Sequence, residues 1–256
     1  NPEPLGVSST PSVCSDQAFS FDPQDNIDAA GGNSIPSTFT WEVTSISGTV
    51  TGVVLNDLGT GPVAGNINNV SSSNATIVYT VTPTSGACAG TPFTITVTVN
   101  PTPTTLGLTN QTYCNGIPTT QIVLTNGVSG TTYAWTNSNT AIGLAASGTG
   151  NIPVFTPTNS GTAPITGTIS IIATANGCSR VAETYIITVN PSPAVSFSPT
   201  NQTICSGDTS VLVNLSSTTA GATFAWTAVQ PTGITGVTTS GTNTIPAQTL
   251  VNDTNA

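Results

Sequence analysis

The sequence predicts an all-β protein built from tandem β-sandwich repeats that form a rod. Three observations support this prediction: landmark residues recur along the 256-residue chain, apolar residues alternate with threonine in short segments, and Val, Ile and Thr are abundant. Strict alternation is typical of half-buried antiparallel strands, and β-branched residues suit a pleated surface. We find no segment with the periodicity of a helix.

The recurring landmarks define three units. Each unit begins at an Asn-Pro dipeptide followed by X-Pro, and continues through a cysteine and an aromatic-x-Trp motif. We predict repeat one at 1–99, repeat two at 100–189 and an incomplete repeat three at 190–256 that lacks its last strands. The landmarks are Asn1-Pro2, Asn100-Pro101 and Asn190-Pro191; the first cysteines Cys14, Cys114 and Cys205; Trp41, Trp135 and Trp226; and the second cysteines Cys88 and Cys178.

The strands within a unit can be recognised from their alternation. The segment FTITVTVN at 93–100 places Phe93, Ile95, Val97 and Val99 on one face and threonine on the other, and ATIVYTVT at 75–82 follows the same rule. Turn signals such as TSGACAG and TANGCS separate these runs. About seven short strands in about 95 residues are typical of an immunoglobulin-like sandwich.

Each tryptophan has two interpretations. It could stack on a sugar ring, or it could lie in the core between two sheets. An aromatic residue precedes each one by two positions and therefore shares its face of the strand. We favour the core interpretation for Trp41, Trp135 and Trp226, with Phe39, Tyr133 and Phe224 as their neighbours.

The regular cysteines indicate disulfides and an oxidising, extracellular compartment. The simplest hypothesis pairs them within repeats, Cys14 with Cys88 and Cys114 with Cys178, and leaves the partner of Cys205 beyond the end of the chain. In an immunoglobulin-like path, however, the two cysteines of one repeat lie at opposite ends, about 30 Å apart, which is too far for a disulfide. A bond across the junction, from Cys14 to Cys178, avoids this difficulty. We favour the within-repeat pairing, and the alternative stays open.

The junctions themselves are short and contain two prolines each. Proline fixes φ and restricts the residue before it, and no Gly/Ser spacer is present. We therefore expect adjacent repeats to adopt limited angles and the chain to form a semi-stiff rod.

The charge of the chain excludes several partners. Arg180 is the only basic residue against ten acidic ones, and the net charge is −9. Binding to nucleic acid or to anionic lipid requires clustered Lys and Arg, so we expect neither nucleic-acid binding nor attraction to a membrane surface. No segment is long and apolar enough to suggest insertion into a membrane.

The same composition argues against an enzyme. The chain has no His and no Lys, so it has neither a Ser-His pair nor a Schiff-base lysine. Paired carboxylates remain one chemical option, but Glu183 is the only acid of repeat two. We expect no catalytic residues and no cofactor.

One acidic cluster in repeat one has a second interpretation. Asp16, Asp22, Asp25 and Asp28 lie close together in CSDQAFSFDPQDNIDAAGG and offer the oxygen ligands that Ca²⁺ prefers. Their spacing does not match an EF-hand loop. A solvated loop that keeps a weakly charged protein soluble is the simpler hypothesis, and a calcium site is the alternative.

Longer stretches resemble a known group of proteins. The segments QTICSGDTSVLVNLSSTTAGATFAWTA and ATANGCSRVAETYIITVNPSP resemble the PKD-like and Ig-like repeats of very large Bacteroidetes surface proteins, which include the gliding-motility adhesins of the SprB type. The resemblance covers nearly the whole chain, although repeat one departs from it with CSDQ and GAC. It implies type IX secretion, exposure at the bacterial cell surface and a role as stalk or adhesive filament.

Three functions follow as hypotheses. The first is a structural and adhesive repeat of a large cell-surface adhesin or filament, whose partners are other repeats and surface glycans. The second is a spacer or glycan-binding module of a secreted polysaccharide-degrading enzyme. The third is a polymerising subunit whose repeat three is closed by a strand from a neighbour, because unpaired sheet edges invite such pairing.

Overall fold

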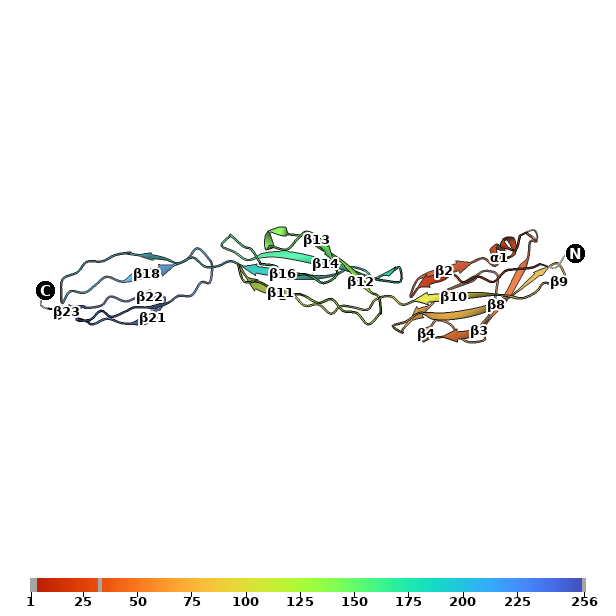
Figure 1. The fold of residues 1–256 in the computed structure, drawn as a ribbon, viewed down its shortest axis with the longest axis horizontal. Coiled ribbons are helices and arrows are strands. Elements are labelled where there is room, and N and C mark those ends of the chain that lie inside the picture. The colour runs from red at the N-terminus through yellow and green to blue at the C-terminus, as the bar shows by residue number, and fades with distance from the viewer. Residues whose placement is uncertain (1–3, 32–33, 255–256) are drawn as a thin grey trace.

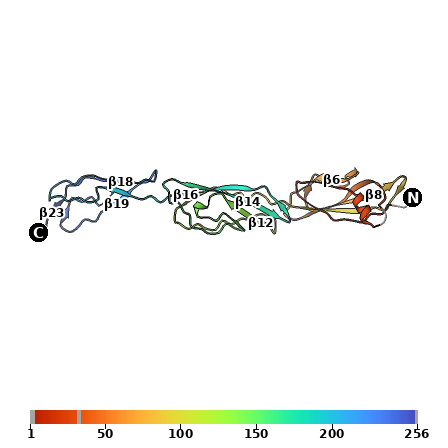
Figure 2. The same ribbon diagram turned by 90° about the horizontal axis from the view of Figure 1, so that it is seen from above.

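The molecule is a row of three β-rich bodies, shown from two sides in Figures 1 and 2. This computed structural model describes residues 4–31 and 34–254, so the Asn1-Pro2 landmark lies outside the described residues. The N-terminus and the C-terminus lie at opposite ends of the row, and the three bodies follow one another in chain order (Figure 1). The fold is all-β and immunoglobulin-like, as predicted, and the tandem repeats form a rod.

Repeat one is built on a six-stranded sheet. The strand order is β1-β10-β8-β3-β5, with β9 paired to β8, and β1 runs parallel to β10 while the other pairs are antiparallel. Two short ribbons, β2–β6 and β4–β7, complete the repeat. Its elements are β1 (Ser12–Cys14), β2 (Ala18–Phe21), α1 (Gln24–Ala29), β3 (Thr38–Ser47), β4 (Val50–Thr51), β5 (Leu58–Thr60), β6 (Val63–Asn66), β7 (Asn68–Asn69), β8 (Ala75–Ser85), β9 (Cys88–Ala89) and β10 (Phe93–Asn100).

Repeat two has the same sheet. The order β11-β16-β14-β12-β13, with β15 paired to β14, matches that of repeat one strand for strand, and β11 is again parallel to β16. The two long strands β14 and β16 form an antiparallel hairpin around the short strand β15. The elements are β11 (Gln111–Cys114), β12 (Thr132–Asn137), the 3-10 helix η1 (Thr140–Ile142), β13 (Ser147–Thr149), β14 (Ile165–Ala175), β15 (Cys178–Ser179) and β16 (Glu183–Asn190).

Repeat three has shorter strands and a more open core. Its pairings are β17-β18-β22, β19–β21 and β20–β23, and its described residues include no counterpart of the β14–β16 hairpin. Apart from the seam residue Pro191, Val213 is the one described apolar residue of this repeat that is buried, at 9% exposure. The strands are β17 (Ser196–Ser198), β18 (Val213–Ser216), β19 (Ala225–Thr227), β20 (Ile234–Thr235), β21 (Ser240–Thr242), β22 (Thr244–Ile245) and β23 (Val251–Asn252).

The alternation of apolar residues with threonine in the sequence corresponds to an alternation of buried and half-buried side chains in the strands. In β10 the residues Phe93, Ile95, Val97 and Val99 are buried and the intervening threonines are half-buried. β8 follows the same pattern around Tyr79, and the two strands pair so that their apolar residues share one face. These strands contribute most of the core of repeat one, so the prediction of alternating strands is confirmed.

The expectation of no helix was wrong at one place. The helix α1 follows Pro23, and its Ile27 is completely buried in the core of repeat one. Asn26 donates to the carbonyl oxygen of Val7 at 2.6 Å, which ties the helix to the N-terminal segment. Because α1 has only six residues, it is too short to show a helical period in the sequence.

The tryptophans lie beside glycines across the sheet. Trp135 is buried, and Trp41 and Trp226 are half-buried against their own repeats. In each repeat the residue paired with the tryptophan on the neighbouring strand is glycine, and a Cβ added there would overlap the indole ring. The pairs are Trp41 with Gly59, Trp135 with Gly148 and Trp226 with Gly241.

Burial also affects two tyrosines of the core. Burial, with a smaller contribution from the Asp57 carboxylate, raises the pKa of Tyr79 to about 12. Burial raises the pKa of Tyr185 well above the usual tyrosine value, and Tyr113 adds to the shift. Both side chains are nearly inaccessible, at 3% and 2% exposure, so both hydroxyls stay neutral in the folded protein at physiological pH.

The Trp–Gly pairs give a testable prediction. Substitution Gly148→Ala forces a methyl group into the Trp135 ring, and overpacking of this kind destabilises a core by about 1–3 kcal/mol. Urea unfolding followed by tryptophan fluorescence would measure the loss. The control is Gly127→Ala, because Gly127 is exposed and an added Cβ there meets no atom within 4 Å. Equal stability of the two variants would contradict the packing argument.

Candidate functional site: the stapled junction between repeats

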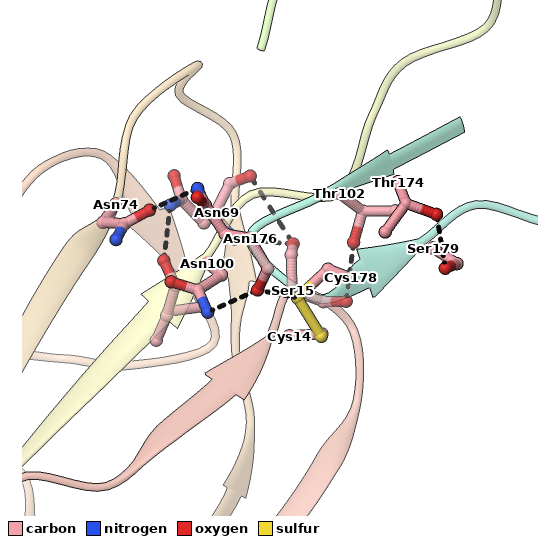
Figure 3. The surroundings of a disulfide bond; sticks show 11 residues. Cys14, Ser15, Asn69, Asn74, Asn100, Thr102, Thr174, Asn176, Cys178 and Ser179 are labelled. Carbon is pink, nitrogen blue, oxygen red and sulfur yellow. Dashed lines mark hydrogen bonds between the residues drawn. A yellow bond between two sulfur atoms is a disulfide. The ribbon is translucent and has the colours of Figure 1, made fainter. Parts of the chain in front are cut away.

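The junction between repeats one and two, which we call the first seam, is closed by a disulfide. Cys14 of repeat one is bonded to Cys178 of repeat two, with Cα atoms 5.5 Å apart and 164 positions of sequence between them. Figure 3 shows the bond with a group of asparagine, serine and threonine side chains around it. The seam is thus both covalent and hydrogen-bonded.

The place of Cys14 follows from the parallel pairing of β1 with β10. This pairing sets Cys14 opposite Asn100, the last residue of β10 and the last before Pro101. The next residue, Ser15, donates its backbone N–H to the carbonyl oxygen of Asn100 at 2.9 Å. Cys14 therefore lies at the end of repeat one that faces repeat two.

The place of Cys178 follows from a tight turn. Asn176 and Gly177 have φ values of 49° and 80°, so both residues of the turn between β14 and β15 are left-handed. Asn-Gly is the sequence that such hairpin turns favour. Across the turn Ala175 pairs with Cys178, which places the cysteine at the tip of the hairpin that reaches back toward repeat one (Figure 3).

The preferred within-repeat pairing was therefore wrong. Cys14 lies beside Asn100 at one end of the sheet, whereas Cys88 pairs with Ser85 at the opposite end of β8. A strand of eight residues separates such ends by more than 20 Å, so the two sulfur atoms cannot meet. The cross-junction alternative is the one the structure contains. Cys88, Cys114 and Cys205 are free thiols.

Asparagine amides reinforce the first seam. Asn100 donates to the carbonyl oxygen of Asn176 at 3.2 Å, and the Asn176 amide donates to the side-chain oxygen of Asn74 at 3.2 Å. On the same side of the junction, the Thr102 hydroxyl donates to the backbone oxygen of Ser15 at 3.4 Å. Neutral hydrogen bonds of this kind stabilise a structure by about 1 kcal/mol each. Their main effect here is to set the orientation of the hairpin, while the disulfide holds it in place.

The single basic residue also supports the seam. Arg180 forms an ion pair with Glu183 at 3.0 Å and donates to the carbonyl oxygen of Pro103 at 3.3 Å. Both oxygens of Glu183 accept the backbone N–H of Leu106, at 3.1 and 3.0 Å. The pair thus fixes the segment that follows the seam prolines onto the β15–β16 turn. Sequence reasoning missed this role, although one cation three residues before the only acid of repeat two was a usable signal.

The four aspartates are spread over the turn after β1 and the α1 helix with the residues just before it, and they are not grouped as metal ligands. Asp22 accepts the backbone N–H of Gln24 at 3.0 Å, and Asp28 accepts the side-chain amide of Gln24 at 3.0 Å, so both serve the helix α1. Asp16 lies instead in the turn after β1, where its N–H donates to the carbonyl oxygen of Ile67. Within 4–31 and 34–254, no three acidic, Cys or His side chains are grouped to hold an ion. The geometry gives the calcium hypothesis at Asp16, Asp22, Asp25 and Asp28 no support.

The described part of the chain also contains no helix long and apolar enough to cross a membrane. A disulfide between structural cysteines is typical of an oxidising, extracellular compartment.

Comparison with known proteins agrees with this fold. Residues 11–103 match the model of the PKD-like domain family, from the start of β1 to just beyond the first seam. No curated protein sequence matches the chain. The family match supports a PKD-like or Ig-like repeat over this part of the chain.

Solved structures with several domains in a row also match this chain, at TM-scores below 0.5. Cadherin domains 1–5 of protocadherin gamma B2 match over 97% of this chain and 53% of their own, at 15% identity and a TM-score of 0.30. Domains 21–23 of human CDH23 match over 81% and 82%, at 13% identity and a TM-score of 0.37. The two immunoglobulin domains of DIP-gamma match over 74% and 98%, at 8% identity and a TM-score of 0.37. This chain spans about half of the first of these structures.

Proposed function

We propose that this chain is a structural and adhesive repeat segment of a large secreted bacterial cell-surface adhesin or filament, and that it acts as a stalk. The observation that carries the proposal is the Cys14–Cys178 bond, because it joins two neighbouring repeats rather than the two ends of one. A bond of this kind restrains the angle between the two repeats and so stiffens the rod at their junction.

The bond also determines how the chain carries a pulling force. Tension applied at the two termini enters repeat one, passes from Cys14 through the disulfide to Cys178 and continues along β16 to repeat three. The residues between the two cysteines lie outside this path, so most of repeats one and two is shielded. With 164 positions of separation, about 550 Å of contour length stays locked.

The composition fits the same role. Charged residues make up 4% of the chain, and Arg180 is its only possible trypsin site, which suits a protein exposed outside a cell. The resemblance to Bacteroidetes surface repeats supports attachment at the cell surface, with type IX secretion and gliding motility as its setting. The partners are other repeats of the same polypeptide or filament and surface glycans. We propose no catalytic activity, no nucleic-acid partner and no insertion into the membrane.

A single-molecule pulling experiment tests the stalk. The chain is held at its two ends, with free thiols alkylated, and extended until it is fully unfolded. The native chain should release about 550 Å less length than Cys178→Ser, in which the staple cannot form. Cys88→Ser removes a free thiol and should behave as the native chain does. Equal full extension of the native chain and Cys178→Ser would contradict the stalk mechanism.

Adhesion between copies is the second part of the proposal, and the outer face of repeat two supports it. On this face Thr166, Thr168 and Thr184 are exposed beside Ile172 and Ile186, with exposures of 44% and 39% for the two isoleucines. None of these five described side chains carries a charge that would repel a second copy.

Sedimentation over a range of protein concentrations tests this lateral contact. We expect self-association that changes little with salt, because few charges are present to screen. Thr168→Glu, in the middle of the face, should reduce it, whereas Thr125→Glu in an exposed loop should not. A chain that stays monomeric at every concentration would remove the adhesive role and leave the stalk.

A further inference from the structure

The junction between repeats two and three, the second seam, is built like the first. β11 runs parallel to β16 and sets Cys114 opposite Asn190, as β1 sets Cys14 opposite Asn100. The residue after each cysteine then donates its N–H to that asparagine's carbonyl oxygen, at 2.9 Å in both seams. Cys114 therefore has the position of Cys14, but it is an exposed free thiol.

The side chains behind the two cysteines also correspond. Asn159 donates its amide to the backbone oxygens of Val189 and Ala163 at 2.8 and 2.9 Å. Asn69 makes the equivalent bonds in repeat one, to Val99 and Ser73, both at 2.8 Å. These asparagines fix the turn next to each seam. The hydrogen bonds around Cys114 therefore match those around Cys14, although Cys114 has no disulfide.

A cavity lies at the second seam where the first seam holds a hairpin. Its volume is about 270 Å³, and on the side of repeat two its lining includes Thr162, Pro164 and Asn190. The last two of these residues have the sequence positions of Asn74 and Asn100, which bind Asn176 of the hairpin in the first seam. The opposite wall is formed by 219–222 of repeat three. The second seam thus has a cavity at the position that the β14–β15 hairpin occupies in the first seam.

Repeat three shows which strands would fill this place. Asn252 and Ser206 form the same reciprocal pair as Asn69 and Ser15: each asparagine N–H is donated to a serine hydroxyl, at 3.0 and 2.9 Å. In repeats one and two this asparagine also holds the last core strand. In repeat three Trp226 is half-buried, and apart from the seam residue Pro191 the one buried apolar residue among those described is Val213. The open core therefore fits a pair of strands like β14 and β16.

We propose that Cys114 is a disulfide site for the following repeat. Its partner is the cysteine at the tip of a two-stranded hairpin that completes repeat three, in the way that Cys178 completes the first seam. This assignment concerns covalent structure and does not depend on adhesion.

The bond forms by oxidation of two thiols. A low-molecular-weight disulfide, such as oxidised glutathione, accepts the two electrons: one protein thiolate attacks it and releases one small thiol, and the second protein thiolate displaces the other. The products are one protein disulfide and two small thiols, so electrons and protons balance.

An extended chain tests the proposal. The segment 164–190, which contains β14, β15 and β16, is repeated after Ala256, and the protein is refolded in a glutathione buffer. Acidic pepsin digestion and mass spectrometry then identify the disulfides. We expect Cys114 bonded to the appended cysteine and Cys14 still bonded to Cys178. Amide hydrogen exchange in β18 and β19 should slow at least tenfold as the core of repeat three closes.

Two controls separate the bond from the fit of the strands. Changing the appended cysteine to serine should retain the slow exchange but leave Cys114 free. Cys114→Ser should also retain the slow exchange and leave the appended cysteine free. A bond between the appended cysteine and Cys205 would overturn the proposal, because it would be a within-repeat pair. Slow exchange with Cys114 still free, or no slowing at all, would also overturn it. None of these outcomes affects the pulling experiment, which depends on Cys14 and Cys178.

Discussion

The constraint on which the rest depends is the parallel pairing, in repeats one and two, of the first strand of the sheet with the last strand. It carries Cys14 to the end of β10, next to the seam, and Cys114 to the end of β16. Because Cys88 and Cys178 lie at the other ends of the same two sheets, neither repeat one nor repeat two can close its own disulfide. The bond therefore crosses the junction, and it links repeats one and two covalently into a rod.

Much of this architecture could be predicted from the sequence. The alternation in 93–100 identified the buried face of β10, and the recurring cysteines and tryptophans identified the repeat, because both signals are local and periodic. The disulfide pairing was harder, since it depends on which ends of two sheets meet. The α1 helix was missed because it is shorter than two helical turns, and Ile27 is its one buried apolar residue.

The seam shows how a protein with little charge uses the charge it has. Arg180 and Glu183 are placed where the proline segment meets the hairpin, and the remaining contacts come from neutral amides and hydroxyls. The sequence is rich in Asn, Ser and Thr, so these residues could not be singled out from it. Their role in holding the seam follows only from their positions in the folded chain. The glycines opposite the tryptophans were overlooked for the same reason, because glycine is common throughout the chain.

The most direct test of this account is a disulfide map of the native 256-residue chain under non-reducing conditions, with free thiols alkylated before digestion. The account predicts a peptide pair linking Cys14 to Cys178, and alkylated Cys88, Cys114 and Cys205. A peptide pair linking Cys14 to Cys88, or Cys114 to Cys178, would contradict it, since each repeat would then close on itself and the seam would carry no staple.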